Sequence, residues 1–133
     1  MKRMTPHQPA EYAEEAKQRW GDTPAYRESA RRTAAYTEQD WARIHAAAAD
    51  LGSRLARALE AGTPAESEAA MDLAEEHRRQ ISEFYYDCSY EIQRGLAQMY
   101  VADERFLARY EAIAPGLTQY LHDAILANAE RAA

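Results

Sequence analysis

The sequence predicts an all-α fold in a single domain. Ala and Glu dominate the 133 residues, whereas β-branched residues are few and there are only five Gly and five Pro. This composition favours helix over sheet. Apolar residues recur at the three- and four-residue spacing of amphipathic helices, and Pro, Gly and capping residues separate the periodic segments. A chain of this length can bury one modest hydrophobic core.

The N-terminal part is expected to form two short helices. The first, residues 9–19, begins at a proline, which is tolerated at the first helical position. The second, residues 24–36, has Thr23 as its N-cap and Pro24 at that same position. No Leu, Ile or Val occurs before residue 37, so these helices can bury little apolar surface alone. We therefore expect residues 1–36 to form a mobile lid and residues 37–133 to form the stable core.

The third expected helix runs from Thr37 to about Ala61. Thr37 and Asp40 resemble a capping box, and Gly62 follows the helix where a C-terminal glycine is favoured. Its apolar positions define one stripe: Trp41, Ile44, Ala48, Leu51, Leu55 and Leu59.

The next periodic segment is too long to be one helix. Its apolar stripe includes Ala70, Leu73, His77, Ile81, Phe84, Cys88, Ile92, Leu96 and Met99. An unbroken helix over residues 66–100 would be ~50 Å long at 1.5 Å per residue, whereas a compact domain of this size is ~36 Å across. A break is expected at Asp87-Cys88-Ser89, the weakest helix formers in the stretch, with Asp87 or Ser89 capping the next helix.

Two further helices complete a total of about seven. Asp103 is expected to cap a short helix through about Ala112. Pro115 and Gly116 separate it from a last helix over residues 117–130.

Charge and motifs exclude several function classes. A net charge of −6 disfavours binding to nucleic acid. No apolar run approaches the ~20 residues that span a bilayer, and no signal peptide is recognisable. The four histidines are far apart and there is one cysteine, so neither a metal site nor a disulfide is expected, and a cytoplasmic setting is the simplest inference. No catalytic motif is present, so we expect a protein that is not an enzyme and has no cofactor.

Aromatic composition points to a pocket or to ordinary packing. Nine Tyr and two Trp accompany only two Phe. Tyr and Trp combine an apolar face with a polar tip, which suits a ligand pocket, although tyrosines also pack along helix surfaces.

Two residues of the long stripe could carry chemistry. His77 could be a buried, hydrogen-bonded histidine, a ligand contact or, as in globins, a haem ligand. Cys88 could be core filler or a single nucleophile. A position at a helix N-terminus would lower the thiol pKa and the neighbouring Asp87 would raise it, so the sign stays open. A Cys–His catalytic pair is not expected, because an unbroken helix separates the two by ~16 Å.

Several segments together resemble the TipAS domain, the drug-sensing half of thiostrepton-responsive regulators. The similarity covers nearly the whole chain and is carried by residues 19–26, 33–37, 40–41, 61–68, 70–72, 76–78, 86–91, 99–106 and 123–129. Ser89 departs from the family pattern, in which glycine is frequent, and no DNA-binding region is present.

The resemblance implies a globin-like, all-α fold without haem that binds thiopeptide antibiotics such as thiostrepton, or albicidin in some relatives. It implies that Cys88 adds covalently to a dehydroalanine of the drug and that the N-terminal helices close over it. We expect drug contacts from aromatic and polar residues of the lid and of the segment near the break: Tyr12, Trp20, Tyr26, Trp41, His77, Tyr86, Asp87, Tyr90 and Glu91. The domain would sense or sequester the drug, as a monomer when isolated. A globin-like cofactor binder and a protein-interaction module are the alternatives.

Overall fold

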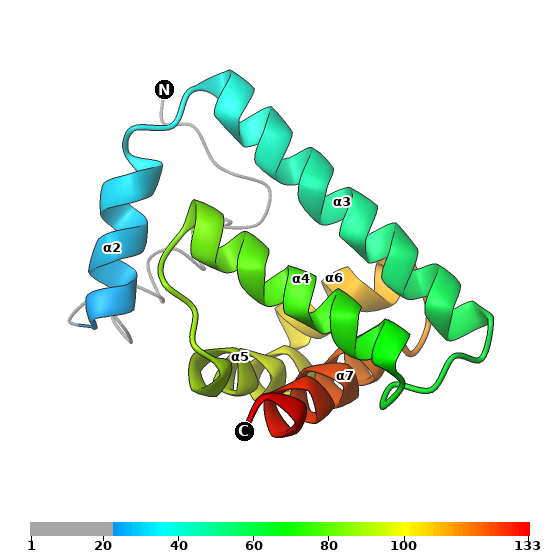
Figure 1. The fold of residues 1–133 in the computed structure, drawn as a ribbon. Helices are drawn as coiled ribbons and strands as arrows, with labels where there is room; N and C mark the ends of the chain where they lie inside the picture. Colours follow the sequence, from blue (N-terminus) through cyan, green and yellow to red (C-terminus); the bar gives the residue numbers. More distant parts are fainter. Residues whose placement is uncertain (1–22) are drawn as a thin grey trace.

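Six helices make up the part of the chain that the structure, a computed structural model, describes, which is residues 23–133 (Figure 1). They are α2 (Pro24–Thr33), α3 (Glu38–Glu60), α4 (Glu68–Phe84), α5 (Tyr90–Ala102), α6 (Glu104–Ile113) and α7 (Leu117–Ala132). These residues contain no strand, which confirms the all-α prediction. The first expected helix, residues 9–19, lies outside the described residues.

Local capping explains where the helices begin. Thr37 and Asp40 form a reciprocal capping box at α3, as the sequence predicts. Thr23 caps α2 with Pro24 at the first turn, and Asp103 caps α6. Gly62, with a φ of 77°, follows the C-terminal end of α3 in the left-handed conformation that glycine adopts without strain.

The predicted break between α4 and α5 is confirmed. Residues 85–89 are not helical, and Ser89, one of the two candidates, caps α5 through the Ile92 amide. Two boundaries differ from the expectation. The helix α2 ends at Thr33 rather than Tyr36, and α4 begins at Glu68 with Ser67 as its cap.

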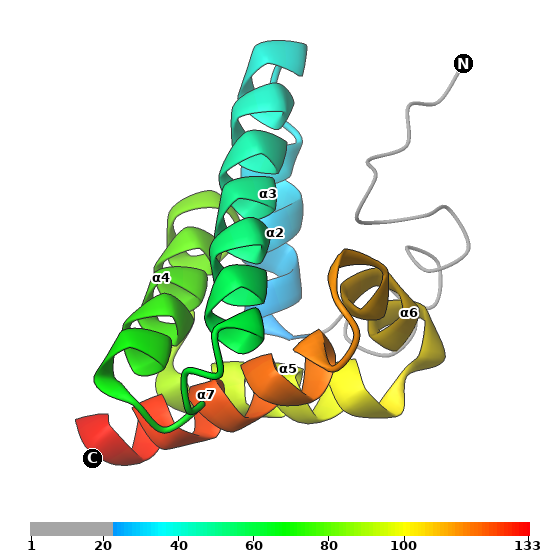
Figure 2. The same ribbon diagram turned by 90° about the vertical axis from the view of Figure 1, so that its right-hand side faces the viewer.

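Two layers of helices enclose the core. Helices α3 and α4 form an antiparallel pair, and α5 and α7 run side by side across its base (Figure 2). The fully buried alanines Ala74, Ala97 and Ala124 lie on α4, α5 and α7, and such small side chains let helices approach closely. Leu55, Leu117, Leu121 and Ile125 are among the largest side chains that are fully buried.

The helix α2 is the least integrated element. It contributes no buried residue and lies alongside the C-terminal half of α4 (Figure 1). Arg32 donates to the Ser82 carbonyl at 2.7 Å, and the Tyr36 hydroxyl, just beyond the helix, donates to the Phe84 carbonyl. Polar contacts therefore hold this segment to the end of α4. Over residues 23–133, no helix combines the length and apolarity needed to cross a bilayer.

Candidate functional site

An apolar cleft of about 390 Å³ lies between α3, α4, α5 and α6. Part of its lining belongs to the two stripes identified in the sequence: Ala48, Leu51 and Leu55 of α3, His77 and Ile81 of α4, and Leu96 and Met99 of α5. Its lining residues are Ser29, Ala48, Ala49, Leu51, Gly52, Leu55, His77, Gln80, Ile81, Tyr85, Tyr86, Leu96, Met99, Tyr100, Phe106, Arg109, Tyr110, Ile113 and Leu121. Such a volume and lining are typical of a binding site for an apolar ligand.

Aromatic rings cluster where α5 meets α6. The ring of Tyr100 lies 5.3 Å from that of Phe106 and 5.1 Å from that of Tyr110, measured between centroids. Burial raises the pKa of both tyrosines, so their hydroxyls stay protonated. The cleft therefore offers flat apolar surfaces that carry hydrogen-bonding groups at their edges.

Gly52 lets α6 approach α3 at the cleft. A Cβ atom at this position would lie 3.3 Å from Cδ1 of Ile113. The side chain of Ile113 keeps 47% of its surface exposed at the rim of the cleft. A larger residue at position 52 would therefore enter the space between the two helices.

His77 is buried in this cleft as a neutral, hydrogen-bonded side chain. Its Nδ1 lies 2.9 Å from Nε2 of Gln93, and its Nε2 lies 3.4 Å from the Tyr100 hydroxyl. Burial lowers its pKa to about 4. Both ring nitrogens are engaged, so the haem-ligand interpretation finds no support in its geometry. The interpretation as a buried, hydrogen-bonded histidine at the cleft wall fits.

Cys88 is buried and is not among the lining residues of the cleft. The residue is 2% exposed, its amide donates to the Ser82 hydroxyl at 3.0 Å, and its carbonyl accepts from Arg78 at 2.8 Å. Burial raises the pKa of the thiol to about 11, opposed by the positive charge of Arg78. Because Ser89 and not Cys88 caps α5, burial rather than the helix terminus decides the sign that the sequence left open.

The other expected contact residues lie at different distances from the cleft. Tyr86 lines it together with His77. Trp41 does not, but its ring lies 6.4 Å from that of the lining residue Tyr85. Asp87 is 98% exposed and lies 3.4 Å from Arg32, which places its carboxylate in solvent at the α2–α4 junction.

The remaining expected contacts are elsewhere. Tyr26 on α2 and the exposed Glu91 on α5 are not among the lining residues. Tyr90 lines a second cavity, described below. Tyr12 and Trp20 lie outside the described residues.

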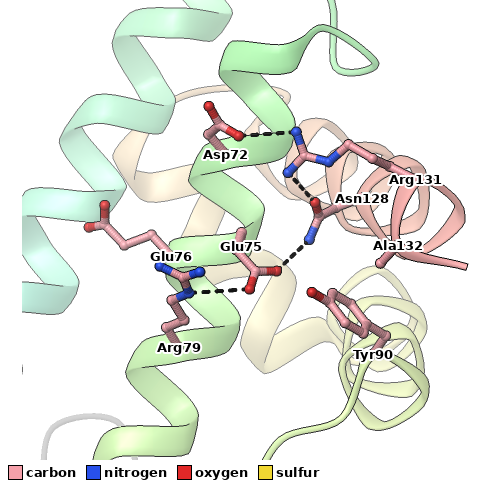
Figure 3. A pocket seen from close by; sticks show the side chains of 8 residues that line it. All are labelled: Asp72, Glu75, Glu76, Arg79, Tyr90, Asn128, Arg131 and Ala132. Atoms are coloured by element: carbon pink, nitrogen blue, oxygen red, sulfur yellow. Dashed lines mark hydrogen bonds and ion pairs between the residues drawn. The ribbon is translucent and has the colours of Figure 1, made fainter.

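The second cavity, of about 490 Å³, is polar and lies between α4 and α7, whose side chains bond to each other across it (Figure 3). Arg131 bonds Asp72 at 3.0 Å, and Asn128 donates to Glu75 at 2.9 Å. Glu75 also accepts from Arg78 and Arg79. The hydrogen bond from Arg78 is the largest cause that lowers the pKa of its carboxyl to about 2, and the bond from Asn128 adds to it. Its charged lining residues are all paired, Glu76 with Arg54 of α3 and the others with one another, as expected of a structural joint between helices.

Sequence reasoning missed the cleft residues contributed by α6 and the end of α5. Tyr100 directly follows Met99 but is not part of the stripe, and Phe106, Arg109 and Tyr110 lie beyond both stripes in the sequence, so only folding brings them to the cleft. Two signals pointed there: the excess of tyrosine, and the glycine at position 52 inside a predicted helix, which indicates close approach of another element.

Comparison with known proteins agrees with this architecture. The family described as the TipAS antibiotic-recognition domain matches residues 12–128. The HTH-type transcriptional activator TipA of Streptomyces coelicolor is 51% identical over 123 residues, covering 92% of this chain and 49% of the relative. The HTH-type transcriptional activator mta of Bacillus subtilis is 35% identical over 127 residues, covering 95% and 48%. The chain thus spans about half the length of the curated relatives it matches.

Solved structures show the same fold. TipAS from Streptomyces lividans in complex with nosiheptide superposes with a TM-score of 0.88 at 51% identity, covering 93% of this chain and 87% of that chain. The antibiotic-binding domain of a TipA-class multidrug resistance transcriptional regulator gives a TM-score of 0.63 at 50% identity, covering 68% and 96%. From its sequence and its fold, the chain belongs to the family of TipAS antibiotic-recognition domains.

Proposed function

We propose that this domain binds thiopeptide antibiotics in the cleft between α3, α4, α5 and α6, without turnover. The observation that carries the proposal is the aromatic, apolar lining of this cleft, in a chain whose fold matches that of TipAS solved with nosiheptide. Apolar and aromatic walls with few polar groups suit a rigid, largely apolar peptide. An albicidin-like drug is a second ligand class compatible with such a lining.

The lid forms part of this proposal. A cleft of about 390 Å³ is at the small end of ligand pockets and leaves much of a large peptide antibiotic uncovered. We place residues 1–36 over the remainder, with residues 37–133 as the core. Ser29 of α2 already borders the cleft, and α2 has no buried residue that would fix it to the core. A ligand that buries apolar surface against α2 would supply the missing contacts.

Drug binding would serve either sensing or sequestration. The curated relatives are transcriptional activators about twice as long as this chain. We propose that the domain acts as the drug sensor of such a regulator or, free-standing, as a resistance protein that holds the drug. We infer a cytoplasmic location, because a regulator acts where the DNA is. The lone, unpaired thiol agrees with this location.

Covalent capture at Cys88 is the chemical step that we add to binding. The thiolate sulfur would bond to the methylene carbon of a dehydroalanine while the carbon–carbon π bond breaks. The α-carbon would then take up one proton, which balances the proton that the thiol lost. The step needs no oxidant or metal. Cys88 is close enough to Tyr100, a lining residue, to raise its pKa. The segment 85–89 must open before the thiol reaches a ligand, because the side chain is buried.

Titration with nosiheptide tests the proposed function. We expect saturable binding and a higher Tm, because a ligand at 100 times its Kd adds about 2.7 kcal/mol to the free energy of unfolding. Gly52→Leu should reduce affinity at least tenfold by filling the cleft beside Ile113. Gly95→Leu is the matched control, because a Cβ there meets no atom within 4 Å. Equal affinity of wild type and Gly52→Leu would place the ligand elsewhere.

Intact mass after incubation with thiostrepton tests the covalent step. We expect a protein–drug adduct in the wild type and only reversible binding in Cys88→Ala. An adduct that persists in Cys88→Ala would refute the assignment of this residue.

A further inference from the structure

The last turn of α4 has backbone carbonyls that its own helix does not satisfy. The amides of Tyr85 and Tyr86 both donate to the Ile81 carbonyl, so the helical ladder stops at Ile81. The carbonyls that follow lack helical partners, as they do at every helix end. Basic side chains often supply donors at such an end, but the last turn of α4 contains no basic residue. Donors for these carbonyls have to come from water or from another element.

The segment of α2 supplies two of these donors, from its place beside the end of α4 (Figure 1). Arg32 donates from Nη1 to the Ser82 carbonyl, 2.7 Å away. Just beyond the helix, the Tyr36 hydroxyl donates to the Phe84 carbonyl. The guanidinium is well placed, because its positive charge faces the negative end of the α4 dipole. Glu28, one turn earlier in α2, accepts from Arg32 at 2.6 Å and holds that side chain in position.

Ser82 also holds the segment 85–89, through its side chain. Its hydroxyl oxygen accepts from the Cys88 amide at 3.0 Å, while its carbonyl accepts from Arg32. The same arginine lies 3.4 Å from the carboxylate of Asp87, the residue before the cysteine. Departure of Arg32 would therefore loosen the last turn of α4, and with it the hydroxyl to which the segment is bonded.

We propose that α2 acts as a latch on the segment 85–89: while α2 is docked the segment keeps Cys88 buried, and release of α2 lets the segment open. In the docked state Cys88 is 2% exposed. Ser29 of α2 borders the cleft, so the movement that uncovers the cleft also frees the thiol. The coupling is a property of the ligand-free domain and goes beyond the proposed function, and only its use in drug capture rests on that function.

The latch would make the thiol reactive only when the cleft is open. A small electrophile meets a buried sulfur for as long as α2 is docked. A ligand that enters the cleft needs α2 to be released, and it meets the thiol in that same state. Closure of α2 over the ligand would then follow capture.

Thiol labelling of the ligand-free domain tests the latch in one direction. Arg32→Met and Tyr36→Phe each remove one bond between the α2 segment and the end of α4, the second without a change of charge. We expect iodoacetamide to label Cys88 about five- to thirtyfold faster in Arg32→Met and about fivefold faster in Tyr36→Phe. The Tm should change little, because α2 has no buried residue.

Two matched variants serve as controls for labelling. Arg31→Met removes a side chain that is 71% exposed and bonds Glu28 within α2. Tyr120→Phe removes a hydroxyl that, like that of Tyr36, donates to a backbone carbonyl, here that of Thr63. Both controls should label at the wild-type rate. A gain in the α2 variants no larger than in the controls, or one explained by a lower Tm, would overturn the latch.

Hydrogen exchange tests the reciprocal direction, because coupling between two sites acts equally both ways. Ser82→Ala removes the hydroxyl that holds the Cys88 amide and keeps the carbonyl that holds Arg32. Amides of residues 24–33 should exchange about threefold faster or more in this variant. Ser53→Ala, at an exposed position within α3, is the control and should leave them unchanged.

Faster labelling in Ser82→Ala without faster exchange of α2 would show that the segment opens alone, and would overturn the latch. Because each of these measurements uses the ligand-free domain, the latch and the proposed function fail separately. A wild type that does not bind nosiheptide contradicts the proposed function alone, and uncoupled labelling and exchange contradict the latch alone.

Discussion

The guanidinium of Arg78 donates from Nη1 to the backbone carbonyl oxygen of Cys88, 2.8 Å away, across ten residues of sequence. The same group bonds Glu75 and lies 4.2 Å from the ring centroid of Tyr90. One side chain thus ties α4 both to the segment that holds the thiol and to the first residue of α5.

Loss of this group should destabilise the domain. Arg78→Met leaves the Cys88 carbonyl and the Glu75 carboxylate without their strongest donor, which should cost about 2 kcal/mol of unfolding free energy. Arg79→Met is the control: Arg79 bonds the same carboxylate but its side chain is 74% exposed, so a loss of at most about 0.5 kcal/mol is expected. Urea denaturation measures both, and equal losses would contradict the special position of Arg78.

The Cys88 thiol should react slowly in the folded protein. With its pKa raised to about 11, only about a thousandth of it is thiolate near pH 8, and the buried side chain is shielded from reagents. Iodoacetamide labelling followed by intact mass should be slow at pH 8, faster towards pH 10, and complete in urea. Labelling of the folded protein at the rate of an exposed cysteine would show that the segment 85–89 is already open.

Stability should fall as the solution is acidified below neutrality, because of His77. Its pKa is lowered from 6.5 to about 4, so the unfolded chain binds this proton more tightly than the folded domain does. This contribution is complete above pH ~6.5 and is lost as the pH falls towards ~4. At about pH 5 the loss is of the order of 2 kcal/mol relative to pH 8.

The contribution of His77 is isolated by difference. His77→Gln removes the titrating group, so the unfolding free energy of the variant should change about 2 kcal/mol less than that of the wild type between these two pH values. Parallel pH profiles for the two proteins would assign the acid sensitivity to other groups.

Removal of the Arg32 side chain should make it easier for α2 to separate from the core. Arg32→Met removes the bond to the Ser82 carbonyl and should lower the free energy of local opening of α2 by about 1–2 kcal/mol, with little effect on global stability because α2 has no buried residue. Hydrogen exchange of residues 24–33 should accelerate by roughly five- to thirtyfold. Arg31→Met is the control, since Arg31 bonds the same Glu28 but is 71% exposed. The same acceleration in both variants would argue against the Arg32 contact.

Helix boundaries could be predicted from the sequence because their causes are local. The capping box of Thr37 and Asp40, the proline at position 24 and the cap at Asp103 act within one helical turn, so residue order alone reveals them. The break before α5 followed from the length of the apolar pattern against the size of a compact domain. These features sufficed for the all-α fold and most of its helices.

The environment of the chemical groups was decided only by tertiary packing. Tyr100 of α5 reaches His77 of α4, and Tyr110 of α6 packs against Tyr100, through contacts between residues on different helices. Desolvation of the Cys88 thiol depends on what covers it, which no neighbouring residue encodes, and it is the largest cause of the raised pKa of the thiol. The sequence by itself determined which residues form helices and which faces are apolar. Packing determined which of those faces line the cleft, because burial and hydrogen-bond direction depend on all the helices that surround a group.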